Sequence, residues 1–101
     1  MSGICRVDGV DVVFVGPYDL AASMGLLGTN FGQNPVWQET VQKVLIASQG
    51  ARKPAGIHAQ SIEEVKTYFR QGFRFLAVGS DVQFLRLAVN SILSELKVRC
   101  N

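Results

Sequence analysis

Asp19 is the residue whose surroundings most clearly suggest chemistry. It follows Gly16, Pro17 and Tyr18 at the end of an apolar run, residues 10–15. Glycine allows close approach to the backbone, and proline fixes the turn. Because Pro17 has no N–H, the free donors beyond this run are the amides of Tyr18 and Asp19, and such a turn can hold a carboxylate or a phosphate. The Asp19 carboxylate can bind a hard divalent cation, or it can cap the turn that follows.

Four other residues stand at the ends of later apolar runs. His58, the single histidine, could reach the same carboxyl-terminal ends of the strands as Asp19. A structural hydrogen bond is, however, the commoner role for such a residue. Gly79 and Ser80 could form an anion-binding turn, and Asp81 is expected to cap the helix that follows it. One carboxylate does not complete a Mg²⁺ or Mn²⁺ site, and the sequence shows no second ligand.

Three apolar runs are predicted to be the strands that position these residues: 10–15, 54–59 and 73–78. Their apolar character is nearly continuous, which is typical of strands covered on both faces. Apolar residues at helical spacing lie between the first and second runs, between the second and third, and after the third. Strands that alternate with helices predict an α/β fold with a parallel sheet. Three such units leave two sheet edges open.

Capping residues mark the expected helices. Asn34 and Ser61 are the expected N-caps, the second as part of a capping box with Glu64. Gly50 and Gly72 are the expected stops. The helices should bury one stripe each, and the aromatic residues should be core. The residues expected to be buried are Trp37, Val41, Val44, Leu45, Ser48, Ile62, Val65, Phe69, Phe73 and Phe75.

Two further segments invite a functional interpretation. Residues 23–34 form a glycine-rich connection, which is longer than most loops. The last helix is apolar over a wide part of its circumference, so it is either well covered within the chain or in contact with a partner subunit. The pattern leaves both interpretations open. The residues concerned are Phe84, Leu85, Leu87, Ala88, Val89, Ile92, Leu93 and Leu96.

The composition excludes several classes of protein. The chain has 101 residues, of which 48% are hydrophobic and 18% charged, with a net charge of +2. A chain of this length can bury one modest core, and its apolar content excludes disorder throughout. The scattered, balanced charge argues against nucleic-acid binding, and no apolar run reaches the ~20 residues of a membrane span. Cys5 and Cys100 form neither a zinc site nor a disulfide framework, so we expect a cytoplasmic protein.

The segment Val7–Val15, followed by Gly16–Gly25 (GPYDLAASMG), resembles the HpcH/HpaI aldolase family. This family includes 4-hydroxy-2-oxoheptanedioate aldolase and 2-dehydro-3-deoxyglucarate aldolase. Two later segments, Gly50–Ile57 and Gly72–Asp81, are similar in order and spacing. The resemblance implies a partial TIM (β/α)₈ barrel whose three units correspond to strands six to eight. Residues 1–101 would then form a single incomplete barrel domain.

The resemblance also implies a function. Such aldolases cleave 4-hydroxy-2-oxo acids to pyruvate and an aldehyde with a divalent cation, Mg²⁺, Mn²⁺ or Co²⁺. Asp19 would be a metal ligand, and Gly16, Pro17, Tyr18 and Asp19 would bind the substrate carboxylate. The family's catalytic base and arginine lie upstream of this chain, and His58 does not replace them. We therefore expect the chain alone to be weakly active or inactive.

One departure from the family's pattern concerns the pocket itself. Tyr18 stands where the family usually has alanine or serine, and it could reshape the pocket. Two alternatives to an aldolase also remain. The chain could be a non-enzymatic module that self-associates, through its last helix and open sheet edges, or completes a barrel with a longer homologue. It could instead belong to a phosphate-binding barrel, with the ligand held at Gly79 and Ser80.

Overall fold

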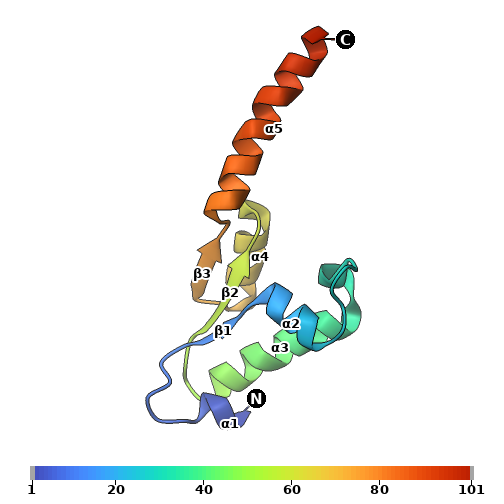
Figure 1. Cartoon of the computed structure of the whole chain (residues 1–101). Coiled ribbons are helices and arrows are strands. Elements are labelled where there is room, and N and C mark those ends of the chain that lie inside the picture. The colour runs from blue at the N-terminus through green and yellow to red at the C-terminus, as the bar shows by residue number, and fades with distance from the viewer. Residues whose placement is uncertain (1, 101) are drawn as a thin grey trace.

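The computed structural model describes residues 2–100, with side chains described for residues 3–97. Cys5 is buried, whereas the side chain of Cys100 lies outside the described residues. Helices and strands alternate along the chain, as expected (Figure 1). The elements are α1 (Ser2–Cys5), β1 (Val13–Val15), α2 (Pro17–Ser23), the 3₁₀ helix η1 (Phe31–Gln33), α3 (Pro35–Gly50), β2 (Ala55–Ala59), α4 (Ile62–Gln71), β3 (Phe75–Val78) and α5 (Asp81–Cys100).

The three strands form one parallel sheet in the order β1-β2-β3, which confirms the predicted α/β class. Val13 is in register with Ala55, and Ile57 with Leu76. Each strand is shorter than its apolar run. For β1 the reason is that pairing begins where the Val13 amide donates to the Pro54 carbonyl at 3.1 Å, since Pro54 has no N–H to extend the ladder.

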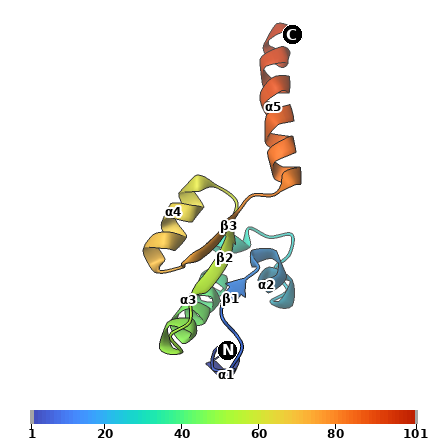
Figure 2. The same cartoon turned by 90° about the vertical axis from the view of Figure 1, so that its left-hand side faces the viewer.

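The core lies on one face of the sheet, between the strands and the helices α3 and α4 (Figure 2). Val15 and Ile57 point into it and are buried. The opposite face carries Phe14 and Phe75, whose rings meet edge to face at 5.8 Å. Both rings are exposed, so the described residues leave this part of the face without full cover. Gly56 allows this contact, since a Cβ there would lie 2.7 Å from the Phe14 ring.

The predicted core is confirmed on α3 and wrong on α4. All five α3 residues expected to be buried are buried, and so is Phe73, which follows α4. Ile62 and Phe69 are exposed, and Val65 is only partly buried. Phe75 is also exposed, on the open face of the sheet. The prediction assumed that both faces of the sheet and the apolar face of α4 are buried. The described residues bury only one face of the sheet.

The helix caps agree with the sequence in two cases out of three. The Asn34 carboxamide oxygen accepts from the Val36 amide at 2.9 Å, and the Ser61 hydroxyl accepts from the Glu64 amide at 3.2 Å. The cap of α5 is Ser80 rather than Asp81, since the Ser80 hydroxyl accepts from the Gln83 amide at 3.1 Å. Asp81 is therefore the first residue of the helix, where a carboxylate is also favourable.

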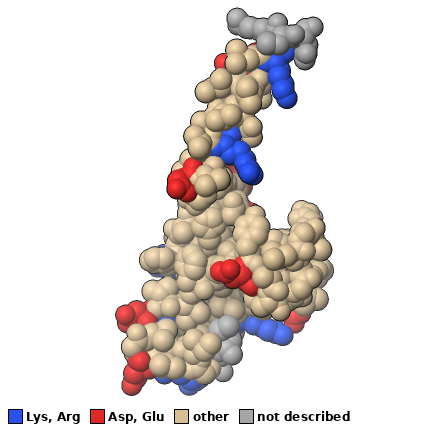
Figure 3. Space-filling view, viewed as in Figure 1, with Lys and Arg blue, Asp and Glu red and all other residues tan. Residues whose placement is uncertain are grey.

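α5 extends away from the rest of the chain instead of packing on it (Figures 1 and 2). The molecule is accordingly elongated, with extents of 58 × 25 × 22 Å. The apolar side chains of the expected stripe, from Phe84 to Leu96, are all exposed, so the described residues do not cover α5. Figure 3 shows only a few charged groups spaced along it. No helix within the described residues is long and apolar enough to cross a membrane.

Candidate functional site

The turn between β1 and α2 carries Asp19 beside the end of the strand. Gly16 is extended, with φ −89° and ψ 108°, and Pro17 opens the helix. A Cβ built on Gly16 would lie 2.8 Å from Asp19 Oδ2, a contact that real Cβ atoms do not make. Glycine is therefore what allows the Asp19 carboxylate to lie against the strand end, which gives a physical reason for the Gly-Pro-Tyr-Asp sequence.

The polar groups of this turn are free to bind a ligand. Within residues 3–97, the amides of Tyr18 and Asp19 have no hydrogen-bond acceptor. The Asp19 carboxylate is exposed and accepts no hydrogen bond from the described residues. The alternative that Asp19 caps the turn thus has no hydrogen bond to support it. Two amide donors and one oxygen ligand are what this turn offers.

Asp19 faces the unpaired edge of β1. It lines a hollow of about 330 Å³ together with Val13, Val15 and Leu20. No other carboxylate, histidine or cysteine lines this hollow, and the described residues contain no group of three such side chains that could hold a metal ion. Those residues therefore supply one oxygen ligand for a cation and do not complete a metal site.

The Tyr18 ring and the Asp19 carboxylate line different hollows. Tyr18 meets Phe31 edge to face at 5.3 Å, and Phe31 in turn lies 5.3 Å from the ring of Trp37. Tyr18 lines a hollow of about 390 Å³ beneath the loop 27–32, which shares no lining residue with that of Asp19. The bulky side chain that departs from the family's pattern thus turns away from the carboxylate and leaves its own amide accessible.

His58 holds two strand ends together. Its Nε2 lies 2.6 Å from the carbonyl oxygen of Gly79, and its Nδ1 lies 3.2 Å from Gln60 Nε2. The neutral tautomer with hydrogen on Nε2 satisfies both contacts, since Nε2 then donates and Nδ1 accepts. Both ring nitrogens are therefore engaged in the fold, which is the structural role described above as the commoner one for such a histidine.

Gly79 and Ser80 are also used by the fold. The Gly79 amide donates to the Ala59 carbonyl at 3.0 Å, and the Ser80 hydroxyl caps α5. Gly79 has φ +66°, and a Cβ there would lie 2.6 Å from the Phe84 ring. Glycine is needed here for the turn into α5. An anion at this turn would have to compete for the Gly79 amide, whereas the Ser80 hydroxyl accepts in the cap and keeps its own hydrogen to donate.

Two glutamines that the sequence did not single out complete this connection. Gln83 Nε2 donates to the Gln60 carbonyl oxygen at 2.7 Å, which links α5 to the end of β2. The Gln60 amide donates to Glu64 Oε2 at 2.6 Å, so the capping box reaches one residue further back than expected. Their type and spacing carry no signal for this role, because it depends on which strand ends are neighbours.

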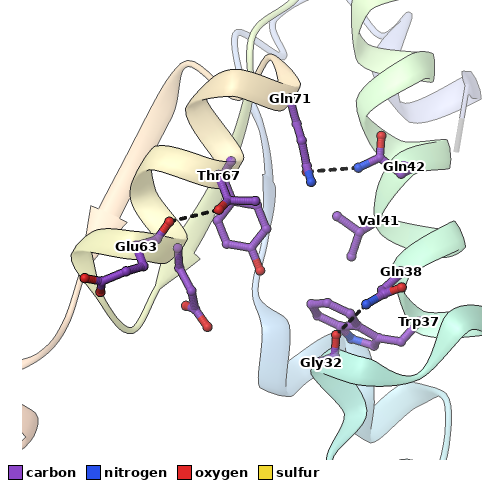
Figure 4. A pocket seen from close by; sticks show the side chains of 10 residues that line it. Gly32, Trp37, Gln38, Val41, Gln42, Glu63, Thr67 and Gln71 are labelled. Carbon is purple, nitrogen blue, oxygen red and sulfur yellow. Dashed lines mark hydrogen bonds between the residues drawn. The ribbon is translucent and has the colours of Figure 1, made fainter.

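A third hollow lies between α3 and α4, with a volume of about 550 Å³ (Figure 4). Trp37 and Val41 line it from α3, and Thr67 lines it from α4. A hydrogen bond of 3.0 Å from Gln42 Nε2 to Gln71 Oε1 bridges the two helices. This hollow was not predicted, since its residues belong mainly to two helices whose packing the sequence pattern does not specify.

Comparison with known proteins indicates one family. The sequence profile of the HpcH/HpaI aldolase/citrate lyase family matches residues 1–88. A 5-keto-4-deoxy-D-glucarate aldolase from Salmonella arizonae is 36% identical over 97 residues, and one from Citrobacter koseri shows the same identity. Each match covers 96% of this chain and 37% of the relative. The chain thus spans little more than a third of the length of these relatives.

Solved structures agree with the sequence comparison. A HpcH/HpaI aldolase/citrate lyase family protein from Burkholderia cenocepacia J2315 superposes with a TM-score of 0.86 at 35% identity. A HpcH/HpaI aldolase from Desulfitobacterium hafniense DCB-2 superposes with a TM-score of 0.85 at 25% identity. In both cases the match covers 95% of this chain and 37% of the other. The arrangement of strands and helices is therefore that of three βα units of such proteins.

Proposed function

The chain belongs to the HpcH/HpaI aldolase/citrate lyase family, and from this premise we propose that it serves an aldolase that cleaves 4-hydroxy-2-oxo acids to pyruvate and an aldehyde. The observation that carries this proposal is the turn Gly16–Asp19, where the Asp19 carboxylate and the amides of Tyr18 and Asp19 have no partner among the described residues. The relatives named above support the class of reaction.

The turn suits the recognition of a 2-oxo acid. The two amides stand at the start of a helical turn, where fixed N–H dipoles favour a bound carboxylate. Gly16 leaves room for the backbone to approach it. We infer that the Tyr18 and Asp19 amides hold the carboxylate of the 2-oxo acid and that Asp19 binds a cation beside it.

Members of this family generally use a divalent metal ion. Such a cation polarises the carbonyl of a 2-oxo acid and stabilises the enolate formed on cleavage. The exposed Asp19 carboxylate is a hard oxygen ligand of the kind that Mg²⁺ or Mn²⁺ takes. The described residues fit one position of such a site and do not complete it. Asp19 lies beside the unpaired edge of β1, where a further strand could supply a second ligand.

The side chains described, residues 3–97, offer no evident group for the proton transfer. His58, its single histidine, uses both ring nitrogens in structural hydrogen bonds. Asp81 starts α5, and its carboxylate accepts from the Val82 amide at 2.8 Å. We therefore expect the purified chain to bind a 2-oxo acid and to release little or no pyruvate from a 4-hydroxy-2-oxo acid.

Binding of pyruvate tests the proposal. Pyruvate with Mg²⁺ is titrated into the ¹⁵N-labelled chain, and the amide resonances of Tyr18 and Asp19 are expected to shift most. Asp19→Asn should weaken the effect of Mg²⁺. The matched control, Asp81→Asn, makes the same change at the same edge of the sheet and should leave binding unchanged. Shifts centred elsewhere, or equal effects of the two variants, would refute the assignment.

Self-association is the second candidate function, and the exposed apolar surface of α5 favours it. We propose that α5 and the two open sheet edges contact another copy of the chain. This is compatible with the aldolase proposal, because the enzyme could assemble through the same surface. The alternative of a phosphate-binding barrel has less support, since the Gly79 amide already donates to the Ala59 carbonyl.

A further inference from the structure

The hollow between α3 and α4 is not used by the chemistry proposed for Asp19. It meets the hollow beneath the loop 27–32 at three side chains that line both: Trp37, Glu64 and Tyr68. Their volumes, about 550 and 390 Å³, are in the range of small-molecule sites. The two hollows are therefore large enough to hold a ligand rather than a single water molecule. We call the place where they meet, lined by those three side chains, the junction.

The junction contains polar groups that lack partners within residues 3–97. Trp37 is 4% exposed, and its buried indole Nε1 has no acceptor. The Tyr68 hydroxyl has no partner there either. Glu64 uses Oε2 to accept from the Gln60 amide at 2.6 Å, which leaves Oε1 free. A buried donor without an acceptor costs free energy, so a ligand oxygen that displaces the atoms covering Trp37 Nε1 and accepts its hydrogen would remove this cost.

Glu64 is fixed in place by the cap of α4. Its own amide donates to the Ser61 hydroxyl, and its Oε2 is held by the Gln60 amide. The capping role explains why a glutamate stands here, but it occupies only one of the two carboxylate oxygens. The remaining oxygen belongs to a positioned carboxylate that lines both hollows together with the rings of Trp37 and Tyr68.

The charge of the junction narrows the ligand class. The only carboxylates that line either hollow are those of Glu63 and Glu64, and neither hollow is lined by a lysine or an arginine. An acidic ligand would be repelled. Burial, and secondarily the charge of Glu64, raise the pKa of Tyr68, so its hydroxyl remains a donor at neutral pH. An ammonium group only donates hydrogen bonds, so it cannot accept from Trp37 or Tyr68. A hydroxyl group both donates and accepts, so it can pair with all three side chains.

We propose that this junction binds a small neutral polyol, of the size of a three- or four-carbon sugar or sugar alcohol. Glu64 Oε1 accepts from one ligand hydroxyl, while Trp37 Nε1 and the Tyr68 hydroxyl donate to others. The aromatic faces cover the carbon chain. Pro17 and Tyr18 of the Asp19 turn line the hollow beneath the loop 27–32, but none of the three proposed hydrogen-bonding side chains belongs to that turn, so the proposal does not depend on the proposed aldolase activity.

Trp37 provides a specific probe, because it is the single tryptophan and gives one indole N–H resonance. Erythritol is titrated into the ¹⁵N-labelled chain. Erythronate and 1,4-diaminobutane are titrated separately, as an acidic and an amine compound of the same chain length. Erythritol is expected to shift the indole resonance saturably, while the other two do not. The proposal is wrong if erythritol has no saturable effect up to roughly 100 mM, or if the acid or the amine binds more tightly. It is equally wrong if the indole resonance lies at the position of exposed tryptophan, because the junction then does not form.

Two variants that each remove one hydroxyl give a matched test. Tyr68→Phe keeps the edge-to-face contact with Phe73 at 5.6 Å but removes the donor. We expect it to weaken erythritol binding about threefold to tenfold, the effect of one hydrogen bond. Thr40→Val removes a hydroxyl that bonds only within α3, to the Val36 carbonyl, and lines neither hollow. It should bind erythritol like the parent chain. Equal affinity of Tyr68→Phe and the parent chain would overturn the assignment.

Discussion

Tyr18 and Asp19 are neighbours at the end of β1, but their side chains make different contacts. Asp19 faces the unpaired edge of the strand, while Tyr18 packs on Phe31, which packs on Trp37. A hydrogen bond from Gln38 Nε2 to the Gly32 carbonyl also ties the loop between α2 and α3 to α3, and we infer that the ring contacts hold the loop together with it. Gly16 and Asp19 were predicted from the sequence because their types suit a strand-end turn. The ring contacts were not predicted, because they depend on how the loop folds back.

The contact between Tyr18 and Phe31 can be tested by truncating the ring. Tyr18→Ala is expected to destabilise the chain by about 0.5–1.5 kcal/mol, the value of an aromatic pair beyond its area. It should also shift the fluorescence of Trp37 to longer wavelength, because the loop opens. Tyr18→Phe keeps the ring and should preserve both properties. Phe69→Ala, at an exposed ring outside these contacts, is the control. Unchanged Trp37 emission in Tyr18→Ala would contradict this account.

At the scale of elements, the order and type of the strands and main helices follow from local signals. Asn34 and Ser61 cap their helices as expected, and Gly72 ends α4 with φ +118°. The burial of each face does not follow in the same way. The apolar face of α4, including Ile62 and Phe69, predicts cover that this chain does not provide. A hydrophobic stripe shows that a face needs a neighbour but not whether the neighbour is in the same chain.

The connection between β3 and α5 rests on Gln83 and Gln60. Gln83→Met removes the donor to the Gln60 carbonyl, which is a side-chain link between α5 and the sheet. We expect ¹⁵N relaxation to show that α5 moves more independently of the sheet in this variant. The stability should change little, since the buried Gln83 Oε1 has no partner among the described residues and is lost as well. Asn90→Met, at an exposed position of the same helix, should leave the relaxation unchanged. If the two variants behave alike, the link does not orient α5.

At the scale of the whole molecule, much apolar surface has no cover. The open face of the sheet, its two free edges and the length of α5 are all exposed. Large exposed apolar patches mark interaction sites in soluble proteins. The chain spans 37% of the curated relatives it matches, and it carries three βα units of their fold. The uncovered surfaces are therefore those that a parallel sheet of this kind needs to bury.

Light scattering after size-exclusion chromatography tests the proposed self-association. The chain has a mass of 11.0 kDa, and we expect a species of at least twice that mass. Replacing Leu85 and Ile92 together by glutamate should return the mass to 11.0 kDa, because it charges the apolar surface of α5. Replacing Ser91 and Ser94 by glutamate adds the same charge at polar positions of the helix and is the control. A monodisperse monomer of the unaltered chain would rule out this assembly.

The most direct test of the central claim, that the turn Gly16–Asp19 is the functional site, uses Mn²⁺ as a paramagnetic probe. In the presence of pyruvate, Mn²⁺ should broaden the amide resonances of residues 15–20 before all others. Asp19→Asn should abolish this selective broadening, because the variant replaces the anionic oxygen ligand by a neutral amide. Broadening centred on Glu63 and Glu64, or broadening of residues 15–20 that persists in Asp19→Asn, would contradict the account.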